Sequence, residues 1–354
     1  MLAVLVALLP VTVFLIVLIL FDSFKLVPRS MLASALLSGA VAAGVAFVLH
    51  GWLFGLTGLS TWAFSRYVAP VTEETLKALC VLYPLRRHHF GFLVDAAIIG
   101  FAIGTGFALV ENIDYLRTLR DEPIWLWVVR GFGTAILHAT TTGIIATSAK
   151  ALADRFPARG LLVIAPGWAV AILLHSLFNH ALVSPVLAAA TLVLVLPLVV
   201  LTVFQRSEQM THEWVGDGLD LDVELLGLVR SSEFGHTRLG RYLRELRSRF
   251  PGPVVADMFC LMQIDLELAI RVKGLLMARE AGLDLPVDDA ELRARLAERT
   301  YLQHAVGKTG LLALRPLHLS SGRDVWGEYL LERAGRRHRR WAFWPRRAVR
   351  KPGS

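Results

Sequence analysis

Eight polar residues lie in or at the ends of four consecutive apolar stretches, and their types could act on a peptide bond. In chain order they are Glu73, Glu74 and Lys77, then Glu111 and Asn112, then His138, and finally His175 and Asn179. An ionised Asp, Lys or Arg at bilayer depth costs at least about 2.5–3.5 kcal/mol on insertion scales. Such groups therefore persist where they are paired, where they line a wet cavity, or where they function.

The set contains the groups that amide hydrolysis needs. A carboxylate can activate water as a general base. Two histidines and an asparagine can stabilise an oxyanion, whereas two histidines and a carboxylate can bind a metal ion. The chain contains no H-E-x-x-H motif, so metal ligands would come from separate helices, and the spacing leaves both mechanisms open. Each motif also has a structural alternative, in which the polar groups only hold helices together.

Helix spacing gives the two adjacent glutamates different partners. Lys77 lies four residues after Glu73 on the same helix face, so these two side chains can pair. Glu74 points about 100° away from Glu73 and has no local partner. We therefore expect Lys77 to neutralise Glu73, which leaves Glu74 as the general base.

Small residues place the second motif at a close helix contact. Gly100, Gly104 and Ala108 recur every four residues, and Glu111 follows them. Small residues at this spacing let membrane helices pack closely, so Glu111 is expected beside a helix contact rather than in lipid. His138 lies in the middle of the next stretch beside three threonines, which is hard to explain as core filling.

A helical membrane bundle is needed to position these residues. The chain has 354 residues and is 55% hydrophobic, and its apolar residues gather before Gln205. About 20 apolar residues cross the hydrocarbon core, and seven stretches qualify. They are Leu2–Phe21, Met31–Leu56, Ala69–Leu85, Phe90–Asn112, Ile124–Ala149, Gly160–Val183 and Pro185–Phe204. The third is the weakest because it contains the two adjacent glutamates and the lysine.

Basic loops set the predicted orientation. Alternate loops carry Lys25 and Arg29, the run Arg86–His89, and the basic residues of Lys150–Arg159. Because basic loops favour the cytoplasmic side, seven spans place the N-terminus outside and the chain after Gln205 inside. At 1.5 Å per residue, all four motifs can then line one cavity that opens toward the outer face.

The C-terminal part is expected to be soluble and helical. Apolar residues recur at three- and four-residue spacing in Leu219–Phe250, Ala256–Gly282 and Asp288–Ala305. Breaks are expected at Pro251–Pro253 and at Pro286. The predicted all-α chain thus has a membrane domain over 1–205, a helical cytoplasmic domain over 206–332 and a basic aromatic tail over 333–354. We find no catalytic motif after residue 205.

The net charge of +8 does not indicate a nucleic-acid-binding protein. Much of the excess lies between Arg333 and Lys351, where Trp341, Phe343 and Trp344 are interleaved. In a membrane protein such a tail favours anionic lipid headgroups, and a disordered, solvated tail is an equal alternative. The partner of the C-terminal part stays open.

The four motifs in this order resemble the PrsW family of intramembrane proteases, within the wider group that includes the CAAX prenyl-protein endopeptidases. The resemblance covers roughly residues 30–205. Its motifs are E-E-x-x-K at Glu73, F-A-x-x-E-N ending at Asn112, His138 with Gly143 five residues later, and H-x-x-x-N at His175. The resemblance implies a multi-pass cell-membrane endopeptidase that cuts membrane-anchored proteins, such as an anti-sigma factor, at the outer face.

The resemblance also implies which residues carry the reaction. The implied catalytic residues are Glu73, Glu74, Glu111, His138 and His175, with Lys77, Asn112 and Asn179 in support. A divalent metal such as zinc would be bound by Glu111, His138 and His175, or the histidines would act as donors without a metal.

Two other functions use the same residues. A proton-coupled transporter would use intramembrane Glu and His side chains as a relay, although the chain shows no inverted repeat. A non-catalytic scaffold of the same fold would use them only to hold helices together.

Overall fold

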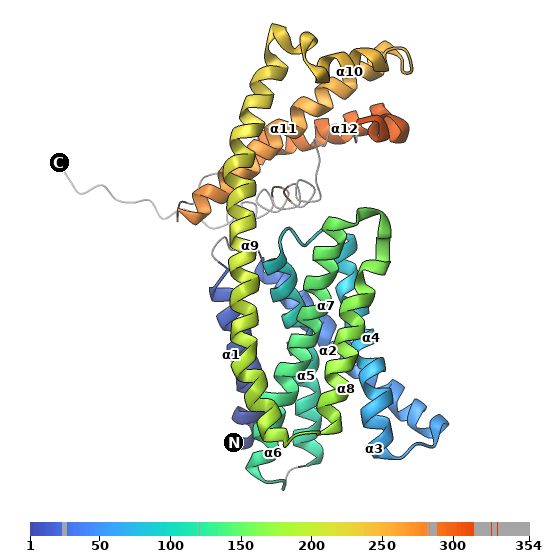
Figure 1. Cartoon of the computed structure of the whole chain (residues 1–354), viewed down its shortest axis with the longest axis vertical. Coiled ribbons are helices and arrows are strands. Elements are labelled where there is room, and N and C mark those ends of the chain that lie inside the picture. The colour runs from blue at the N-terminus through green and yellow to red at the C-terminus, as the bar shows by residue number, and fades with distance from the viewer. Residues whose placement is uncertain are drawn as a thin grey trace, which may run out of the picture. The chain divides into compact units, whose positions relative to one another are not determined.

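The computed structural model is helical in the residues that it describes, which are 1–22, 27–119, 121–281, 283, 289–314, 327 and 331. No strand occurs among these residues, so the all-α prediction is confirmed for them. The α-helices are α1 (Leu2–Leu20), α2 (Arg29–Thr57), α3 (Thr61–Ala63), α4 (Ala69–Arg86), α5 (Leu93–Thr118), α6 (Ile124–Val128), α7 (Ala135–Arg155), α8 (Ala165–His180), α9 (Pro185–Arg230), α10 (Arg238–Leu246), α11 (Gly252–Glu280) and α12 (Asp289–Leu314) (Figure 1). Shorter π- and 3-10 helices join some of them: η1 (Phe64–Val68), η2 (Val129–Thr134), η3 (Pro157–Ile164) and η4 (Ser232–His236).

Two compact units divide the chain, a membrane unit (Met1–Thr211) and a C-terminal unit (His212–Ser354). Helix α9 runs through residue 205, where the sequence predicts the end of the membrane domain. A change from apolar to polar residues alters the surroundings of a helix without ending its hydrogen bonds. The division into 1–205, 206–332 and 333–354 stays a prediction, and the basic aromatic tail lies outside the described residues.

Five helical segments are long and apolar enough to cross a membrane. They are Leu2–Leu20, Arg29–Thr57, Leu93–Thr118, Leu162–His180 and Pro185–Arg230. The other two predicted spans do form helices, but α4 carries four charged residues within 18, and Ile124–Ala149 is divided among α6, η2 and α7. The chain is a membrane protein with several apolar helices, and the count of seven spans stays a prediction.

Helix α5 forms the centre of the membrane unit. It packs against α7 and α2, and it is the most buried of the five candidate spans (Figure 1). Glycines permit these contacts: a Cβ added at Gly104 would overlap the carbonyl oxygen of His138, and one added at Gly106 would overlap that of Leu36. The small-residue stripe predicted from the sequence is therefore confirmed as a helix contact, and α7 is the helix that it contacts.

The C-terminal unit contains the predicted helices with one additional break. Helix α11 begins at Gly252, as the Pro-Gly-Pro sequence predicts, but Leu219–Phe250 is divided by η4. The side chain of Thr237 caps α10 by accepting a hydrogen bond from the amide of Gly240 at 3.0 Å. This cap starts a new helix where apolar spacing alone predicted one that continues. Pro286 lies outside the described residues.

Candidate active site

Four helices of the membrane unit bring six of the predicted side chains into one cluster. Helix α4 supplies Glu73, Glu74 and Lys77, α5 supplies Glu111, α7 supplies His138 and α8 supplies His175. All of them except Glu111 are buried. Helix α4 continues from η1, and its first turn contains Pro70, which lacks a backbone N–H. Both glutamates follow within the next turn.

Lys77 pairs with Glu74, so the predicted pairing with Glu73 is wrong. The Nζ atom of Lys77 lies 2.6 Å from Oε1 of Glu74, and both side chains are completely buried. The same Nζ also lies 2.9 Å from Nδ1 of His138. Spacings of three and four residues both place side chains on one helix face, and the contact with α7 selects the shorter one. Glu74 is therefore the neutralised carboxylate.

Glu74 also holds His175. Its Oε1 atom lies 2.8 Å from Nδ1 of His175 and 3.3 Å from Oγ1 of Thr141. An ionised carboxylate only accepts hydrogen bonds, so Nδ1 of His175 carries the proton. The other ring nitrogen, Nε2, is therefore left with its lone pair.

His138 is held from both sides. Its Nε2 lies 2.9 Å from Oε2 of Glu111, while Nδ1 faces the ammonium of Lys77. An ammonium only donates, so Nδ1 accepts and Nε2 carries the proton that goes to Glu111. The ring also packs against those of Phe107 and His175, with centroids 5.1 and 4.9 Å away. Both imidazoles are thus fixed in orientation and tautomer by carboxylates.

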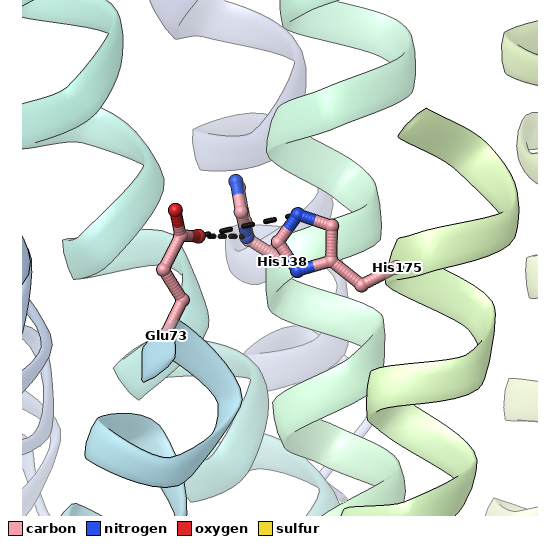
Figure 2. A group of neighbouring side chains, drawn as sticks. All are labelled: Glu73, His138 and His175. Atoms are coloured by element: carbon pink, nitrogen blue, oxygen red, sulfur yellow. Dashed lines mark ion pairs between the residues drawn. The ribbon is translucent and has the colours of Figure 1, made fainter. Parts of the chain in front are cut away.

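Glu73 faces these two imidazoles without a hydrogen bond to either one. Its Oε2 atom lies 3.9 Å from Nδ1 of His138 and 4.0 Å from Nε2 of His175 (Figure 2). This oxygen is buried and has no hydrogen-bond partner among the described residues. Three potential ligand atoms from three helices, Glu73 Oε2, His138 Nδ1 and His175 Nε2, therefore lie around one small space, and Nδ1 of His138 also accepts from Lys77.

With all three of its carboxylates ionised, the cluster would carry one excess negative charge. Its three carboxylates are Glu73, Glu74 and Glu111, and its two cations are Lys77 and Arg130, whose Nη2 lies 3.1 Å from Oε2 of Glu111. Both histidines are neutral in the arrangement above. An uncompensated buried charge is costly, and the excess falls on Glu73. A proton or a cation at Glu73 would remove it.

Comparison with known families identifies the chain. The model of the PrsW family intramembrane metalloproteases matches residues 27–204, which is half of the chain. The chain belongs to the PrsW family. No curated protein and no solved structure matches it. The matched range contains all eight residues predicted from the sequence and excludes helix α1 and the C-terminal unit.

The arrangement fits the metal ion that the family name implies. Ligand atoms of Glu73, His138 and His175 all lie within 4.8 Å of one another, and each imidazole donates its far N–H to a carboxylate, as is usual for metal-binding histidines. Ligands of one zinc ion, about 2.0–2.1 Å from it, lie roughly 3.3 Å apart, so the set is slightly open. Lys77 donates to Nδ1 of His138 and would compete with a metal ion for that atom.

This set differs from the predicted ligands in its carboxylate. The sequence proposed Glu111 with the two histidines, but Glu111 lies behind His138, on the nitrogen that points away from Glu73. The small-residue spacing before Glu111 predicted that this residue lies beside a helix contact. That spacing could not show which ring nitrogen of His138 faces which carboxylate.

The two asparagines have different surroundings. Asn112 accepts a hydrogen bond from Nε of Arg130 at 2.9 Å, so it lies next to the cluster. The side-chain amide of Asn179 donates to the backbone carbonyl of Ser65 at 2.8 Å, and the backbone carbonyl of Asn179 accepts from Nε of Arg66 at 3.2 Å. The structure thus places Asn179 at the contact between α8 and η1, although it shares a helix face with a cluster residue.

Two further residues near the cluster were missed from the sequence. His50 of α2 lies 4.0 Å from Oε1 of Glu73 through Nδ1, and its Nε2 lies 2.6 Å from Oγ1 of Thr72. Arg130 of η2 is buried and pairs with Glu111. Both are ionisable residues inside predicted spans, which was the signal that could have found them.

Proposed function

We propose that this chain hydrolyses peptide bonds of membrane-anchored proteins, with Glu73, His138 and His175 as the ligands of a divalent metal ion. The observation that carries this proposal is the group of three lone-pair atoms, Glu73 Oε2, His138 Nδ1 and His175 Nε2, which face one another. Oxyanion stabilisation needs donors, and both inward ring nitrogens are acceptors. The excess negative charge on Glu73 supports a cation at the same place.

The surrounding residues have separate tasks in this proposal. Glu74 and Glu111 hold the two imidazoles with their lone pairs inward. Lys77 would have to leave Nδ1 of His138 for that atom to serve as a metal ligand, and its 2.6 Å contact with Glu74 would keep it compensated. A bound divalent ion would act as a Lewis acid toward the carbonyl of the substrate.

Glu74 is the proposed general base. Its Oε1 atom makes all of its contacts, whereas Oε2 is buried without a hydrogen bond among the described residues. In the proposed reaction, Oε2 takes a proton from water as the water oxygen bonds to the carbonyl carbon. The C–N bond then breaks, and the proton passes to the leaving amine nitrogen. Lys77 keeps Glu74 ionised but lowers its basicity through Oε1. The atom proposed to accept the proton is therefore Oε2, which has no hydrogen bond among the described residues.

The outer face is the proposed side of cleavage. The basic loops Arg86–His89 and Lys150–Arg155 favour the cytoplasmic side, which places the start of α4 and the end of α5 near the other face. The C-terminal unit is then cytoplasmic. A single-span protein cut near its outer end is the substrate class that fits, and an anti-sigma factor is one such protein.

The test uses the purified full-length protein in liposomes with a tagged single-span substrate. Cleavage, bound zinc per chain and the effect of a chelator are measured together. We expect Glu73→Gln and His175→Ala to lose both zinc and cleavage. Glu74→Gln should lose cleavage but still bind zinc at reduced affinity, because its amide oxygen can still accept from Nδ1 of His175. Asp154→Asn, on α7 and away from the cluster, is the matched control and should behave as wild type.

Other outcomes separate the alternatives. Cleavage that persists in Glu73→Gln would overturn the site assignment. Cleavage by metal-free protein that still requires Glu73 would favour a glutamate-type mechanism. Ion flux through the liposomes without any cleavage would favour the transporter, and neither activity in the wild type would favour the scaffold.

A further inference from the structure

Arg130 connects the metal-binding cluster to the rest of the membrane unit. Its Nη2 lies 3.1 Å from Oε2 of Glu111, and its Nε donates to Oδ1 of Asn112 at 2.9 Å. The guanidinium also lies over the ring of Tyr115, 3.5 Å from the centroid. One buried side chain of η2 therefore contacts three side chains in the last turns of α5.

Helix α1 completes this connection. The amide Nδ2 of Asn112 donates to the carbonyl oxygen of Ala7 at 2.8 Å. On the other side of Arg130, a Cβ added at Gly131 would overlap the carbonyl oxygen of Val6, so the backbones of η2 and α1 touch. The match to the PrsW family begins at residue 27, and α1 therefore lies outside the matched range.

We propose that Arg130 is a positioning residue for the reaction and that α1 is a structural part of the active site. The proposal rests on the proposed function, because Arg130 acts through Glu111 on His138. Oε2 of Glu111 contacts both Arg130 and Nε2 of His138. Arg130 holds this oxygen ionised and in place, and the oxygen holds the proton of His138 on Nε2. Nδ1 is then free of a proton where it faces Glu73.

The geometry favours arginine over lysine. One planar guanidinium donates a hydrogen bond from Nε to Asn112 and places Nη2 in an ion pair with Glu111 at 3.1 Å, without a hydrogen bond from Nη2. A lysine ammonium is a point charge on a flexible stem and could keep the charge near Glu111 without fixing its position. The π-helix η2, a form often found at functional sites, contains Arg130 itself.

The test compares Arg130→Gln and Arg130→Lys with wild type in the same liposome assay. We expect kcat to fall about 10²-fold in Arg130→Gln and about 10-fold in Arg130→Lys, with zinc affinity reduced 10–100-fold, the range for groups that orient metal ligands. KM should stay the same because Arg130 does not touch the substrate. Lys150→Gln is the matched control, since Lys150 is another buried cation, paired with Asp154 at 2.7 Å on α7.

Two more variants test the path of the effect. Arg130→Gln combined with Glu111→Gln should cost no more than Glu111→Gln alone, because both act through His138. In Asn112→Asp, the side chain can still accept from Arg130, but an oxygen replaces the amide group that donates to the Ala7 carbonyl. The hydrogen bond to α1 is then lost, so kcat should fall several-fold if α1 takes part.

Different results would contradict the role of Arg130 and the role of α1. Wild-type kcat in Arg130→Gln, independent effects of the Arg130 and Glu111 changes, or an equal loss in Lys150→Gln would overturn the role of Arg130. Wild-type kcat in Asn112→Asp would overturn the role of α1. Loss of cleavage in Glu73→Gln beside any of these results would leave the proposed function intact, whereas cleavage retained in Glu73→Gln would overturn both.

Discussion

Two lysine–carboxylate pairs, one in each unit, have similar local geometry and different surroundings. Lys77 lies 2.6 Å from Glu74 and 4.7 Å from the ring centre of Phe107. In the C-terminal unit, the buried Lys273 lies 2.6 Å from the partly buried Asp222 and 5.1 Å from the ring centre of Trp214. The distance within the pair and the aromatic neighbour therefore do not distinguish a reactive pair from a structural one.

The second partner of each lysine does distinguish them. Lys273 also donates to the backbone carbonyl of Gly218 at 2.9 Å, an acceptor that cannot change its protonation. Lys77 donates to a histidine ring, and its carboxylate partner holds a second histidine beside the unmatched Glu73. Buried ion pairs are weak evidence for function. A lone carboxylate oxygen next to such a pair is much stronger evidence.

The largest expected effect comes from removing the unmatched charge. Glu73→Gln should lower kcat at least about 10²-fold, while the melting temperature stays the same or rises because an uncompensated buried charge is gone. Asp222→Asn should do the reverse, leaving Lys273 unpaired and lowering stability by about 3–5 kcal/mol without changing kcat. Thermal unfolding and the cleavage assay on the same preparations measure both. Equal destabilisation by the two changes would contradict the comparison.

Double replacements sharpen the same comparison. Lys77→Met should cost about 3–5 kcal/mol because it strands a buried carboxylate, and Lys273→Met should cost less because Asp222 is partly exposed. Adding Asp222→Leu to Lys273→Met should restore stability with normal cleavage. Adding Glu74→Gln to Lys77→Met should restore stability but not cleavage, because both histidines lose a partner. Recovery of cleavage in that membrane-unit variant would show that its ion pair is structural as well.

A smaller effect is expected at the contact between α5 and α7. Gly104→Ala should lower stability by about 1–3 kcal/mol through overpacking and reduce kcat, because the added methyl group pushes on the backbone of His138. Gly44→Ala is the control, since a Cβ there meets nothing within 4 Å, and alanine favours a helix over glycine by about 1 kcal/mol. Equal kcat values in the two variants would mean that His138 tolerates the shift.

Apolar stretches and motif order were enough to predict a helical membrane unit and six residues of the cluster, but not Arg130 or His50. Each residue drew attention because an ionisable group in hydrocarbon is costly, and this holds before any contact is known. The row of small residues at Gly100 and Gly104 likewise predicted a close contact with another helix, because how closely two helix backbones can pack depends on the size of the side chains between them. These inferences need only composition and spacing.

The partners within the cluster could not be predicted, because contacts between helices decide them. Spacing allowed Lys77 to reach either adjacent glutamate, and His138 on α7 determined the choice. The carboxylate that faces the histidines depends on the rotation of α4 against α5, which no local pattern records. The same holds for Arg130, whose partners lie 18 and 19 residues earlier in the chain.

Asn179 gives the smallest expected effect and separates two explanations of the H-x-x-x-N motif. If Asn179 stabilised an oxyanion, Asn179→Ala would lower kcat about 10²–10³-fold. Its side-chain hydrogen bond to the Ser65 carbonyl of η1 instead predicts a stability loss of about 1 kcal/mol and a kcat within a few-fold of wild type. Cleavage and thermal unfolding of Asn179→Ala, with His175→Ala measured beside it, decide between them. A large fall in kcat at unchanged stability would place Asn179 in the reaction and would require α8 to turn when substrate binds.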